Sequence, residues 1–201
     1  MNKTSLYDKH IQENAKLVPF AGYYMPISYG KISDEYNAVR HHCGIFDVSH
    51  MGQIQITGDD AESFLNYLTI NNVEQISNYE AQYSAMCDND GNLLDDLIIF
   101  KFSKIKYIII VNASNKMKVF DWMKSFNDYE VDLDDLNINN SLIALQGPKS
   151  RDILNQISNK VIKIPFYNLE QLKLLNHEII LSRTGYTGEL GYEILGSHAA
   201  I

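Results

Sequence analysis

Two adjacent carboxylates, Asp95 and Asp96, interrupt an apolar segment, residues 93–100, that is typical of a buried strand. Removing an ionised carboxylate from water costs free energy unless another group pairs with it. Because successive side chains of a strand point to opposite faces, the two residues cannot have the same role. A carboxylate on a rigid strand can orient or deprotonate a small polar ligand. The alternative is a strand end where both residues are solvated beside the turn at residues 90–92.

A glycine-rich segment, residues 185–193, is the second candidate for chemistry. Its glycines permit positive φ and a close approach of the backbone to a ligand. Tyr186 offers a flat face for stacking on an aromatic ring. Glu193 could accept two hydrogen bonds from a ring amide and an exocyclic amine, an edge that a pterin presents. A tight β-turn with a surface tyrosine remains the alternative. A phosphate loop is excluded, because no Gly-Lys-Ser/Thr follows and no helix is expected there.

The segment at residues 46–52 places Asp47, Ser49 and His50 among apolar neighbours. These residue types suggest a serine-hydrolase triad, but members of a triad normally come from separate elements. In an extended segment Asp47 and Ser49 would share one face while His50 points away. A local turn that brings Met51 to the wall of a pocket is therefore the favoured interpretation.

Composition excludes several classes of function. The chain has 201 residues, 45% of them hydrophobic and 21% charged, with a formal net charge of -8. Without clustered Lys and Arg, we expect neither a nucleic-acid surface nor a polybasic membrane patch. No apolar run approaches the roughly 20 residues of a membrane helix. Only Cys43 and Cys87 occur, without metal-ligand spacing, so we expect no metal site, a reducing compartment and a cytoplasmic location.

Periodicity predicts the elements that position these residues. Helices are expected at residues 4–16 with Thr4 as N-cap, 33–42 with Ser33 as N-cap, 59–68, 114–126 and 149–157. Strands are expected at residues 53–57, 83–87, 93–102, 106–112, 130–133, 141–146, 178–183 and 192–195, and an aromatic loop at 20–26. From residue 53 to residue 133 the order is β-α-β-β-β-α-β. This order is close to a split-βαβ, ferredoxin-like unit.

Several of these segments occur together in one family. They are Leu6-Tyr7, residues 18–23 with Met25-Pro26, residues 46–52, 91–98, 145–148 and 185–193. In this combination and order the chain resembles the T-protein of the glycine cleavage system, the tetrahydrofolate-dependent aminomethyltransferase. The resemblance covers residues 4–196. Proteins of this family are nearly twice as long, so the chain resembles their N-terminal half.

The resemblance implies an α+β fold with three domains arranged as a cloverleaf around a folate cavity. Residues 1–51 and 138–201 would form a discontinuous, incomplete folate-binding domain. Residues 52–137 would form an inserted ferredoxin-like domain. The rest of the first domain and the third domain, with arginines that contact the folate and the carrier protein, would lie in the part of the family protein that has no counterpart here.

The resemblance also assigns site residues. Asp95 matches the essential carboxylate beside folate N5 and N10, and Asp96 is interpreted as its structural support. Glu193 matches the acid that binds the amide edge of the pterin. Four residues match, or plausibly match, the wall of the folate cavity: Met51, Tyr83, Asn112 and Tyr186.

The implied reaction begins with an aminomethyl group on the lipoyl arm of the H-protein. Ammonia leaves, the methylene carbon passes to tetrahydrofolate, and the reduced lipoyl arm departs. The expected partners are therefore lipoylated H-protein and tetrahydrofolate as cosubstrate, with no metal. Asp95 would orient the folate amines and raise the nucleophilicity of N5.

Three alternatives use the same fold. An iron–sulfur maintenance factor binds folate without transferring a group, but it has a Cys in a Lys-Gly-Cys-Tyr-type segment where this chain has Arg183-Thr184-Gly185-Tyr186. Flavin-dependent dimethylglycine and sarcosine oxidation requires a flavin domain with a dinucleotide fingerprint, which this sequence lacks. An inactive fragment that only binds folate is the third alternative, and for these residues alone inactivity is expected.

Overall fold

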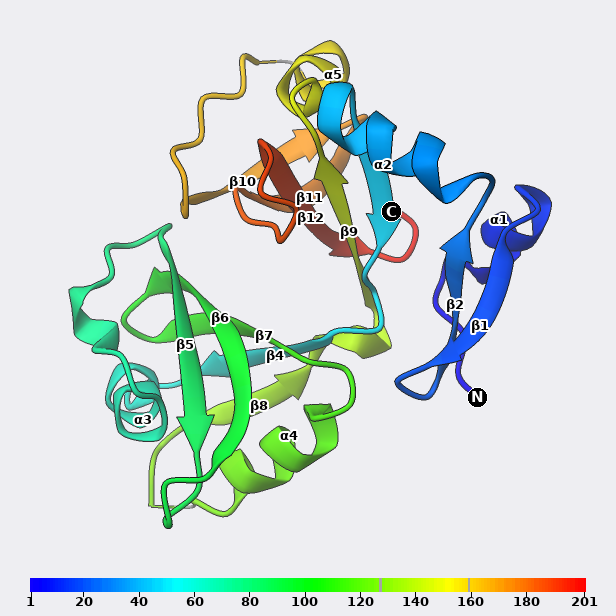
Figure 1. The fold of residues 1–201 in the computed structure, drawn as a ribbon. Helices are drawn as coiled ribbons and strands as arrows, with labels where there is room; N and C mark the ends of the chain where they lie inside the picture. Colours follow the sequence, from blue (N-terminus) through cyan, green and yellow to red (C-terminus); the bar gives the residue numbers. More distant parts are fainter. Residues whose placement is uncertain (127, 159) are drawn as a thin grey trace. The chain divides into compact units, whose positions relative to one another are not determined.

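The computed structural model describes residues 1–126, 128–158 and 160–201. The chain forms two compact units (Figure 1). Unit 1 comprises Met1–His50 and Asn139–Ile201, and unit 2 comprises Met51–Ile138. The resemblance predicts domain boundaries at residues 51–52 and 137–138. The assignment of these parts as a folate-binding domain and an inserted ferredoxin-like domain stays a prediction.

Unit 2 is built on one antiparallel sheet with the strand order β5-β6-β7-β4-β8. Its strands and helices are β4 (Gly52–Thr57), α3 (Ala61–Leu68), η1 (Val73–Gln75), β5 (Ala81–Cys87), β6 (Leu93–Ser103), β7 (Lys106–Val111), α4 (Lys116–Lys124), β8 (Asp132–Asp135) and η2 (Leu136–Ile138). Strands β7 and β8 both run antiparallel to β4, which lies between them, and α4 joins them. This connection is a split βαβ. The sheet has one strand more than the ferredoxin-like pattern contains.

The core of unit 2 lies between the helices and one face of this sheet. Alternate residues of the central strands supply it, as the period of two in a strand requires. The largest fully buried members are Ile54, Ile56, Phe64, Leu65, Met86, Leu97, Ile99, Tyr107 and Ile109. Helix α4 contributes Val119 and Met123.

Unit 1 contains a second antiparallel sheet with the order β10-β11-β12-β9-β3 and a separate β1–β2 hairpin. Its elements are α1 (Tyr7–Gln12), β1 (Lys16–Phe20), β2 (Tyr23–Ser28), α2 (Ile32–His41), β3 (Gly44–Asp47), β9 (Asn140–Gln146), α5 (Ser150–Ile157), β10 (Leu169–Leu174), β11 (His177–Ser182) and β12 (Gly191–Ser197). A core that includes Leu145, Leu154, Leu181, Tyr192 and Ile194 lies on one face of the sheet. Both units together give the α+β fold that the sequence predicts.

Four strands of unit 1 differ from the sequence-based expectation. The segment expected as an aromatic loop forms the β1–β2 hairpin, with Ala21 and Gly22 at positive φ in its turn. Residues 44–47, expected as a helix end followed by a turn, form β3, and residues 169–174 form β10. Strand β3 has only four residues and pairs with β9, which is distant in the sequence, so local periodicity does not reveal it. Strand β10 pairs with the neighbouring strand β11.

The expected N-caps of the first two helices are also wrong. The Thr4 hydroxyl donates to the carboxylate of Asp47 instead, and α1 begins at Tyr7. Helix α2 begins at Ile32, and its N-cap is Lys31, two positions before the expected N-cap Ser33. In the first helix a tertiary contact of Thr4 replaces the expected cap. In the second, the start of the helix is shifted by a short distance along the sequence.

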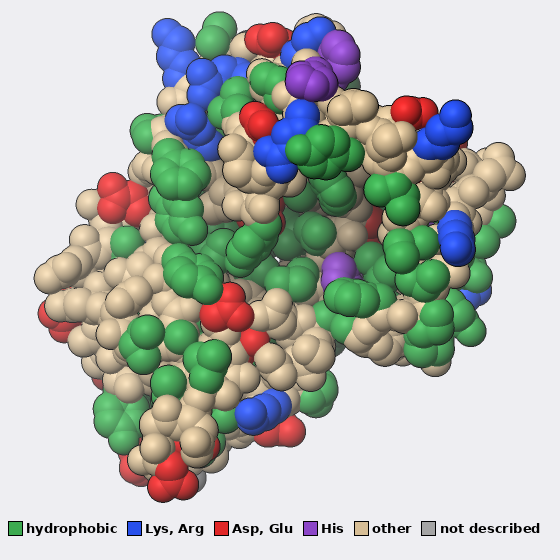
Figure 2. Space-filling view, in the orientation of Figure 1, with side chains coloured by type: hydrophobic (Ala, Val, Ile, Leu, Met, Phe, Trp, Pro, Cys, Tyr) green, Lys and Arg blue, Asp and Glu red, His purple; other side chains and the backbone are tan. Residues whose placement is uncertain are grey.

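Charge is unevenly distributed between the units. Residues 51–138 carry 15 acidic and six basic side chains, whereas the remainder carries ten acidic and eleven basic ones. On the face that Figure 2 shows, Lys and Arg side chains are concentrated on unit 1. Within the described part of the chain, every helix is too short or too polar to span a bilayer.

Candidate functional site

Asp95, the carboxylate expected to be catalytic, is almost completely buried on β6 with 2% of its surface exposed. Its Oδ2 accepts a hydrogen bond from the backbone N–H of Asn112 at 2.7 Å. Its Oδ1 accepts from the side-chain amides of Asn112 at 2.9 Å and Asn115 at 2.6 Å. Asn112 follows β7 and Asn115 directly precedes α4. Asp95 therefore joins the end of β7 to the start of α4.

Asp96 projects from the opposite face of β6 and is only partly buried. Its Oδ2 accepts a hydrogen bond from the Tyr83 hydroxyl at 2.8 Å, and its Oδ1 accepts from Asn112 Nδ2 at 2.9 Å. We expected the Asp95 oxygens to line an open cleft and Asp96 to support them. The burial of the two side chains is the opposite: Asp95 is buried, and Asp96 is partly exposed. Asp95 lies on the side of Leu97 and Ile99, which the helices cover. Alternation then turns Asp96 to the other side.

The second face of the unit 2 sheet gathers most of the expected wall residues. Tyr83 pairs with Ile98, Ile98 with Ile110, and Ile110 with Gln53, so these side chains form one row across four strands. Tyr83 is 47% exposed, at the outer end of that row. Asp96 occupies the neighbouring row, opposite Ala85.

Met51 and Asn112 lie at the same end of this sheet. Met51 directly precedes β4, whose Gly52 pairs with Val111 of β7, and Asn112 directly follows Val111. The structure therefore brings Met51, Tyr83 and Asn112 to one sheet together with Asp96. Asn112 is the link between the two carboxylates, because its side-chain amide donates to both.

Gln53 is a polar residue on this face that the sequence did not single out. Its side chain is completely buried, and neither Oε1 nor Nε2 has a hydrogen-bond partner among the described residues. An unpaired buried amide is uncommon in folded proteins and is often matched by an ordered water. The only sequence signal was a glutamine in a segment that otherwise alternates like a half-buried strand.

Glu193 lies on β12, a central strand of the unit 1 sheet, on the face opposite to the main core of that unit. It is 7% exposed. The Thr184 hydroxyl donates a short hydrogen bond to Oε2, and the Ser182 hydroxyl lies 2.8 Å from that of Thr184. Burial raises the pKa of Glu193, and the hydrogen bond from Thr184 opposes that rise in part. Thr184 directly follows the strand expected at residues 178–183, and no pattern in the sequence marks it as a site residue.

The glycine-rich loop before β12 is organised around the buried side chain of Gln146. Its Nε2 donates to the carbonyl oxygens of Thr184 and Tyr192, both at 3.2 Å, and its Oε1 accepts from the Thr187 hydroxyl at 2.9 Å. A Cβ atom on Gly191 would lie 2.1 Å from Oε1 of Gln146. This glycine is therefore required by the close approach of Gln146.

Tyr186 lies in the same loop, and its side chain is 71% exposed. Gly185, just before it, has φ +152, and a Cβ atom there would also collide with Gln146. Gln146 thus holds the backbone on both sides of the loop and leaves the aromatic ring at the surface. Such a ring can stack on a flat ligand.

Asp47, Ser49 and His50 do not form a triad. Asp47 accepts hydrogen bonds from the Thr4 hydroxyl at 2.6 Å, from His10 Nε2 at 2.8 Å and from the backbone N–H of Ser49 at 2.9 Å. Burial alone would raise the pKa of Asp47, but these hydrogen bonds bring it below its usual value. The Ser49 hydroxyl hydrogen-bonds the backbone of Leu142. Asp47 is therefore an anchor that joins β3 to α1.

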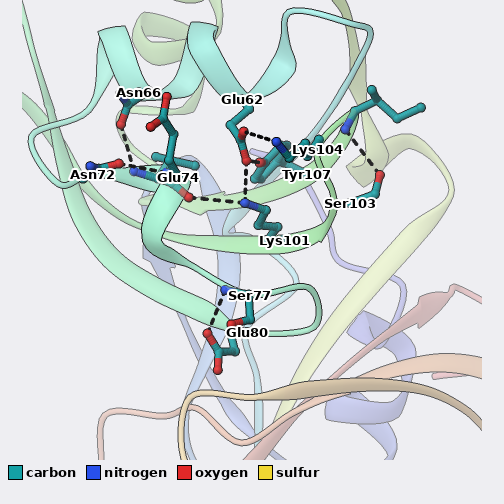
Figure 3. Close-up of polar contacts among 12 residues, drawn as sticks. Glu62, Asn66, Asn72, Glu74, Ser77, Glu80, Lys101, Ser103, Lys104 and Tyr107 are labelled. Atoms are coloured by element: carbon teal, nitrogen blue, oxygen red, sulfur yellow. Dashed lines mark hydrogen bonds and ion pairs between the residues drawn. The ribbon is translucent and has the colours of Figure 1, made fainter.

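A second cluster of ionisable groups, in unit 2, is shown in Figure 3. Lys101 is 4% exposed, and its Nζ lies 2.5 Å from Oε2 of Glu62. The Tyr107 hydroxyl donates to the same oxygen at 3.0 Å. Burial and Glu62 together raise the pKa of Tyr107. Because the ammonium is paired with a carboxylate of α3, this cluster holds the helix on the sheet.

Comparisons with known proteins identify the family of the chain. A profile described as the GCVT N-terminal domain matches residues 6–200. The chain belongs to this family. The resemblance inferred from its sequence is thereby confirmed. Within the residues that the structure describes, no group of three or more His, Cys, Asp or Glu side chains could hold a metal ion.

Two similar proteins are aminomethyltransferases by name. The aminomethyltransferase of Staphylococcus carnosus (strain TM300) is 39% identical over 197 residues, which cover 96% of this chain and 54% of that protein. The crystal structure of glycine cleavage system aminomethyltransferase T from Bartonella henselae is 28% identical with a TM-score of 0.91, covering 98% of this chain and 54% of that one. The chain thus spans about half the length of these relatives.

A more distant match shares the fold alone. The heterotetrameric sarcosine oxidase from Corynebacterium sp. U-96 has a TM-score of 0.58 and 12% identity, covering 83% of each chain.

Proposed function

We propose that this chain forms the N-terminal part of a tetrahydrofolate-dependent aminomethyltransferase of glycine cleavage. Its partners in the complete protein are lipoylated H-protein and tetrahydrofolate, and its location is cytoplasmic. The aminomethyl group on the lipoyl sulfur loses ammonia, its methylene carbon bonds to the folate, and the sulfur departs as a thiol. Family membership and the 39% identity to an aminomethyltransferase support this assignment.

The observation that carries the proposal is the environment of Asp96. This carboxylate stands on a central strand, is partly exposed, and receives hydrogen bonds from Tyr83 and Asn112. It is thus held in one orientation and remains able to accept a further hydrogen bond from a substrate amine. We therefore assign to Asp96 the role that the sequence predicted for Asp95. Asp95 becomes a positioning residue that acts through Asn112.

The remaining residues bind the folate in this proposal. Glu193 accepts hydrogen bonds from the amide and the exocyclic amine of the pterin, a pair of donors that matches a carboxylate. Tyr186 stacks on a ring of the ligand, and Met51 and Tyr83 contribute to the wall of the cavity. Because its pKa is raised, Glu193 is protonated more readily than a glutamate in water. Contact with two ligand donors would favour the ionised form instead.

The experiment compares Asp96→Asn with Asp95→Asn in the complete enzyme, with aminomethylated H-protein and tetrahydrofolate as substrates. We expect Asp96→Asn to lower the rate of methylene transfer about a hundredfold or more, with little change in the free energy of unfolding. Asp95→Asn is expected to reduce that free energy by about 1–3 kcal/mol, because its three donors lose a charged acceptor. Normal transfer by Asp96→Asn together with abolished transfer by a fully folded Asp95→Asn would reverse the assignment.

A folate-binding protein without transferase activity is the second candidate. The observation in its favour is that Glu193 and Tyr186, the residues proposed to contact the pterin, both lie in unit 1 of this chain. Titration of these 201 residues with tetrahydrofolate tests this alternative directly. Binding that Glu193→Ala weakens, without turnover when H-protein is added, would support a binding role for the isolated chain and leave the assignment of Glu193 intact.

A further inference from the structure

Asn137 lies in η2 and hydrogen-bonds the backbone on both sides of Gly52. Its Nδ2 donates to the carbonyl oxygen of Met51 at 2.8 Å, and its Oδ1 accepts from the backbone N–H of Gln53, also at 2.8 Å. A primary amide carries a donor and an acceptor side by side, so one side chain can satisfy both backbone groups. All of these residues belong to unit 2. The roles proposed above do not include Asn137.

The side-chain amide of Asn137 continues the pairing of two strands beyond the point where their main chains separate. The pairing of β8 with β4 ends at Asp135 and Ile54, because the chain then turns into η2. Beyond that point Asn137 bonds one edge of the segment at residues 51–53. On the other edge, β7 pairs with the first residues of β4. Bonds on both edges fix the path of an extended segment, and with it the point from which the Met51 side chain projects.

An ion pair holds Asn137 in place in turn. Its backbone N–H donates to Oδ1 of Asp135 at 3.1 Å, and Oδ2 of Asp135 lies 2.7 Å from Nζ of Lys116, the first residue of α4. The Lys116 side chain is only 14% exposed, so salt weakens this pair less than it weakens a pair on the surface. The start of α4 therefore holds Asn137 beside the segment that carries Met51.

The same end of α4 also holds the two carboxylates of β6. Asn115, which directly precedes Lys116, donates to Oδ1 of Asp95 at 2.6 Å. Asp95 in turn accepts from Asn112, whose side-chain amide also donates to Asp96. Two sets of hydrogen bonds thus meet at the start of α4. One leads to the carboxylate proposed to contact the folate amine, and the other leads through Asn137 to the proposed wall of the cavity.

We propose that Asn137 is a positioning residue that acts through Met51 to shape the folate cavity. This inference rests on the proposed function, in which Met51 contributes to the wall of that cavity. Without the Asn137 side chain, the Met51 carbonyl and the Gln53 N–H lose these partners, and the segment has to turn them toward other groups. The Met51 side chain then moves away from the ligand. A misplaced wall residue weakens ligand binding while the reacting groups stay in place.

The test measures methylene transfer by the complete enzyme with Asn137→Ala, at varied concentrations of tetrahydrofolate. We expect KM for tetrahydrofolate to rise about tenfold while kcat stays within about twofold of the wild type, because a contact common to bound substrate and transition state is lost. Asn66→Ala is the matched control (Figure 3). Asn66 is also partly buried in unit 2, and its Oδ1 accepts from the backbone N–H of Val73 at 2.9 Å. This variant should lose stability but keep the KM of the wild type.

A double variant tests whether Asn137 acts through Met51. We expect Met51→Ala to raise KM for tetrahydrofolate, and the addition of Asn137→Ala to raise it by less than about twofold further, because two changes that remove one contact are not additive. An unchanged KM in Asn137→Ala, an equal rise in Asn66→Ala, or a full additional rise in the double variant would each overturn the proposal.

Asn137→Asp decides the case in which Asn137→Ala does not fold. Aspartate keeps the acceptor for the Gln53 N–H but turns a charged oxygen toward the Met51 carbonyl, so we expect KM to rise relative to Asn66→Asp, and an equal KM in the two would overturn the inference. Met51→Ala separates this inference from the proposed function. A raised KM in Met51→Ala with a normal KM in the Asn137 variants overturns the inference alone. A normal KM in Met51→Ala overturns both the inference and the proposed place of Met51 in the cavity wall.

Discussion

At the scale of single residues, two buried carboxylates of unit 1 show how the surroundings determine ionisation. Asp47 receives three hydrogen bonds and its pKa is lowered, whereas Glu193 receives one from a side chain and its pKa is raised. Burial acts in the same direction on both. The number of donors therefore decides the sign of each shift.

Glu193→Gln tests the raised pKa. A carboxylate whose pKa is raised by folding stabilises the protein below its unfolded pKa and loses that contribution as the pH rises through its folded pKa. Glutamine keeps the hydrogen-bond acceptor for Thr184 but carries no charge. We expect Glu193→Gln to gain stability relative to the wild type as the pH rises above about 4.3, the ordinary pKa of glutamate. Urea unfolding between pH 4 and pH 8 measures the difference, and a pH-independent difference would contradict it.

Asp47→Asn should behave in the opposite way. The lowered pKa of Asp47 stabilises the fold above its unfolded pKa, and this contribution is lost as the pH falls through the folded value. We expect the substitution to cost about 1–3 kcal/mol at neutral pH and less in acid, because the charged acceptor of Thr4 and His10 is removed. Unfolding curves at pH 7 and pH 3 provide the measurement. An equal loss of stability at both pH values would show that the negative charge of Asp47 does not account for the loss.

At the scale of elements, single side chains hold neighbouring segments together. Asp95 joins β7 to α4, Gln146 holds the loop before β12, and the pair formed by Glu62 and Lys101 attaches α3 to the sheet. In each case the contact joins residues that are distant in the sequence. Disruption of these contacts should therefore affect stability more than secondary structure.

Gly191→Ala tests the contact with Gln146. The added methyl group would lie within 2.5 Å of three side-chain atoms of Gln146. We expect overpacking to cost about 1–3 kcal/mol. In a Gln146→Ala background those atoms are absent, so the same substitution should cost much less. Thermal unfolding of the four proteins gives the coupling energy. Additive effects would show that the glycine is required for another reason.

Glu62→Gln tests the buried ion pair. Lys101 would remain buried without a charged partner, and removing one member of such a pair costs about 3–5 kcal/mol. The double variant Glu62→Leu with Lys101→Met removes both charges and should be more stable than Glu62→Gln alone. Denaturant unfolding distinguishes the two outcomes. A stable Glu62→Gln variant would indicate that the pair is solvated.

At the scale of the whole molecule, the two units present different surfaces. Unit 2 carries most of the negative charge, while unit 1 contains an apolar groove between β2, α2 and β3, where Ile32 and Ile45 are exposed. We expect the isolated 201-residue chain to associate through exposed hydrophobic surface more than a longer family member does. Light scattering of the chain with and without Ile45→Lys checks this expectation. Unchanged association in the variant would exclude the groove as its cause.

Much of the fold could be predicted because its elements carry their own patterns. The strands around residues 53–57 and 93–102 and the helix at 61–68 follow from alternation and helical spacing. Strand β3 could not be predicted, since it forms only by pairing with β9, about a hundred residues away. Pairing between distant segments leaves little trace in a local window of sequence.

The sequence by itself determined the family and the presence of two carboxylates on opposite faces of one strand. It could not determine which of them is buried. That depends on which face of β6 receives α3 and α4, a matter of packing between distant segments. The tertiary structure places Asp95 on that face and leaves Asp96 on the other. Burial belongs to the packed arrangement, and alternation alone only ensures that the two residues differ.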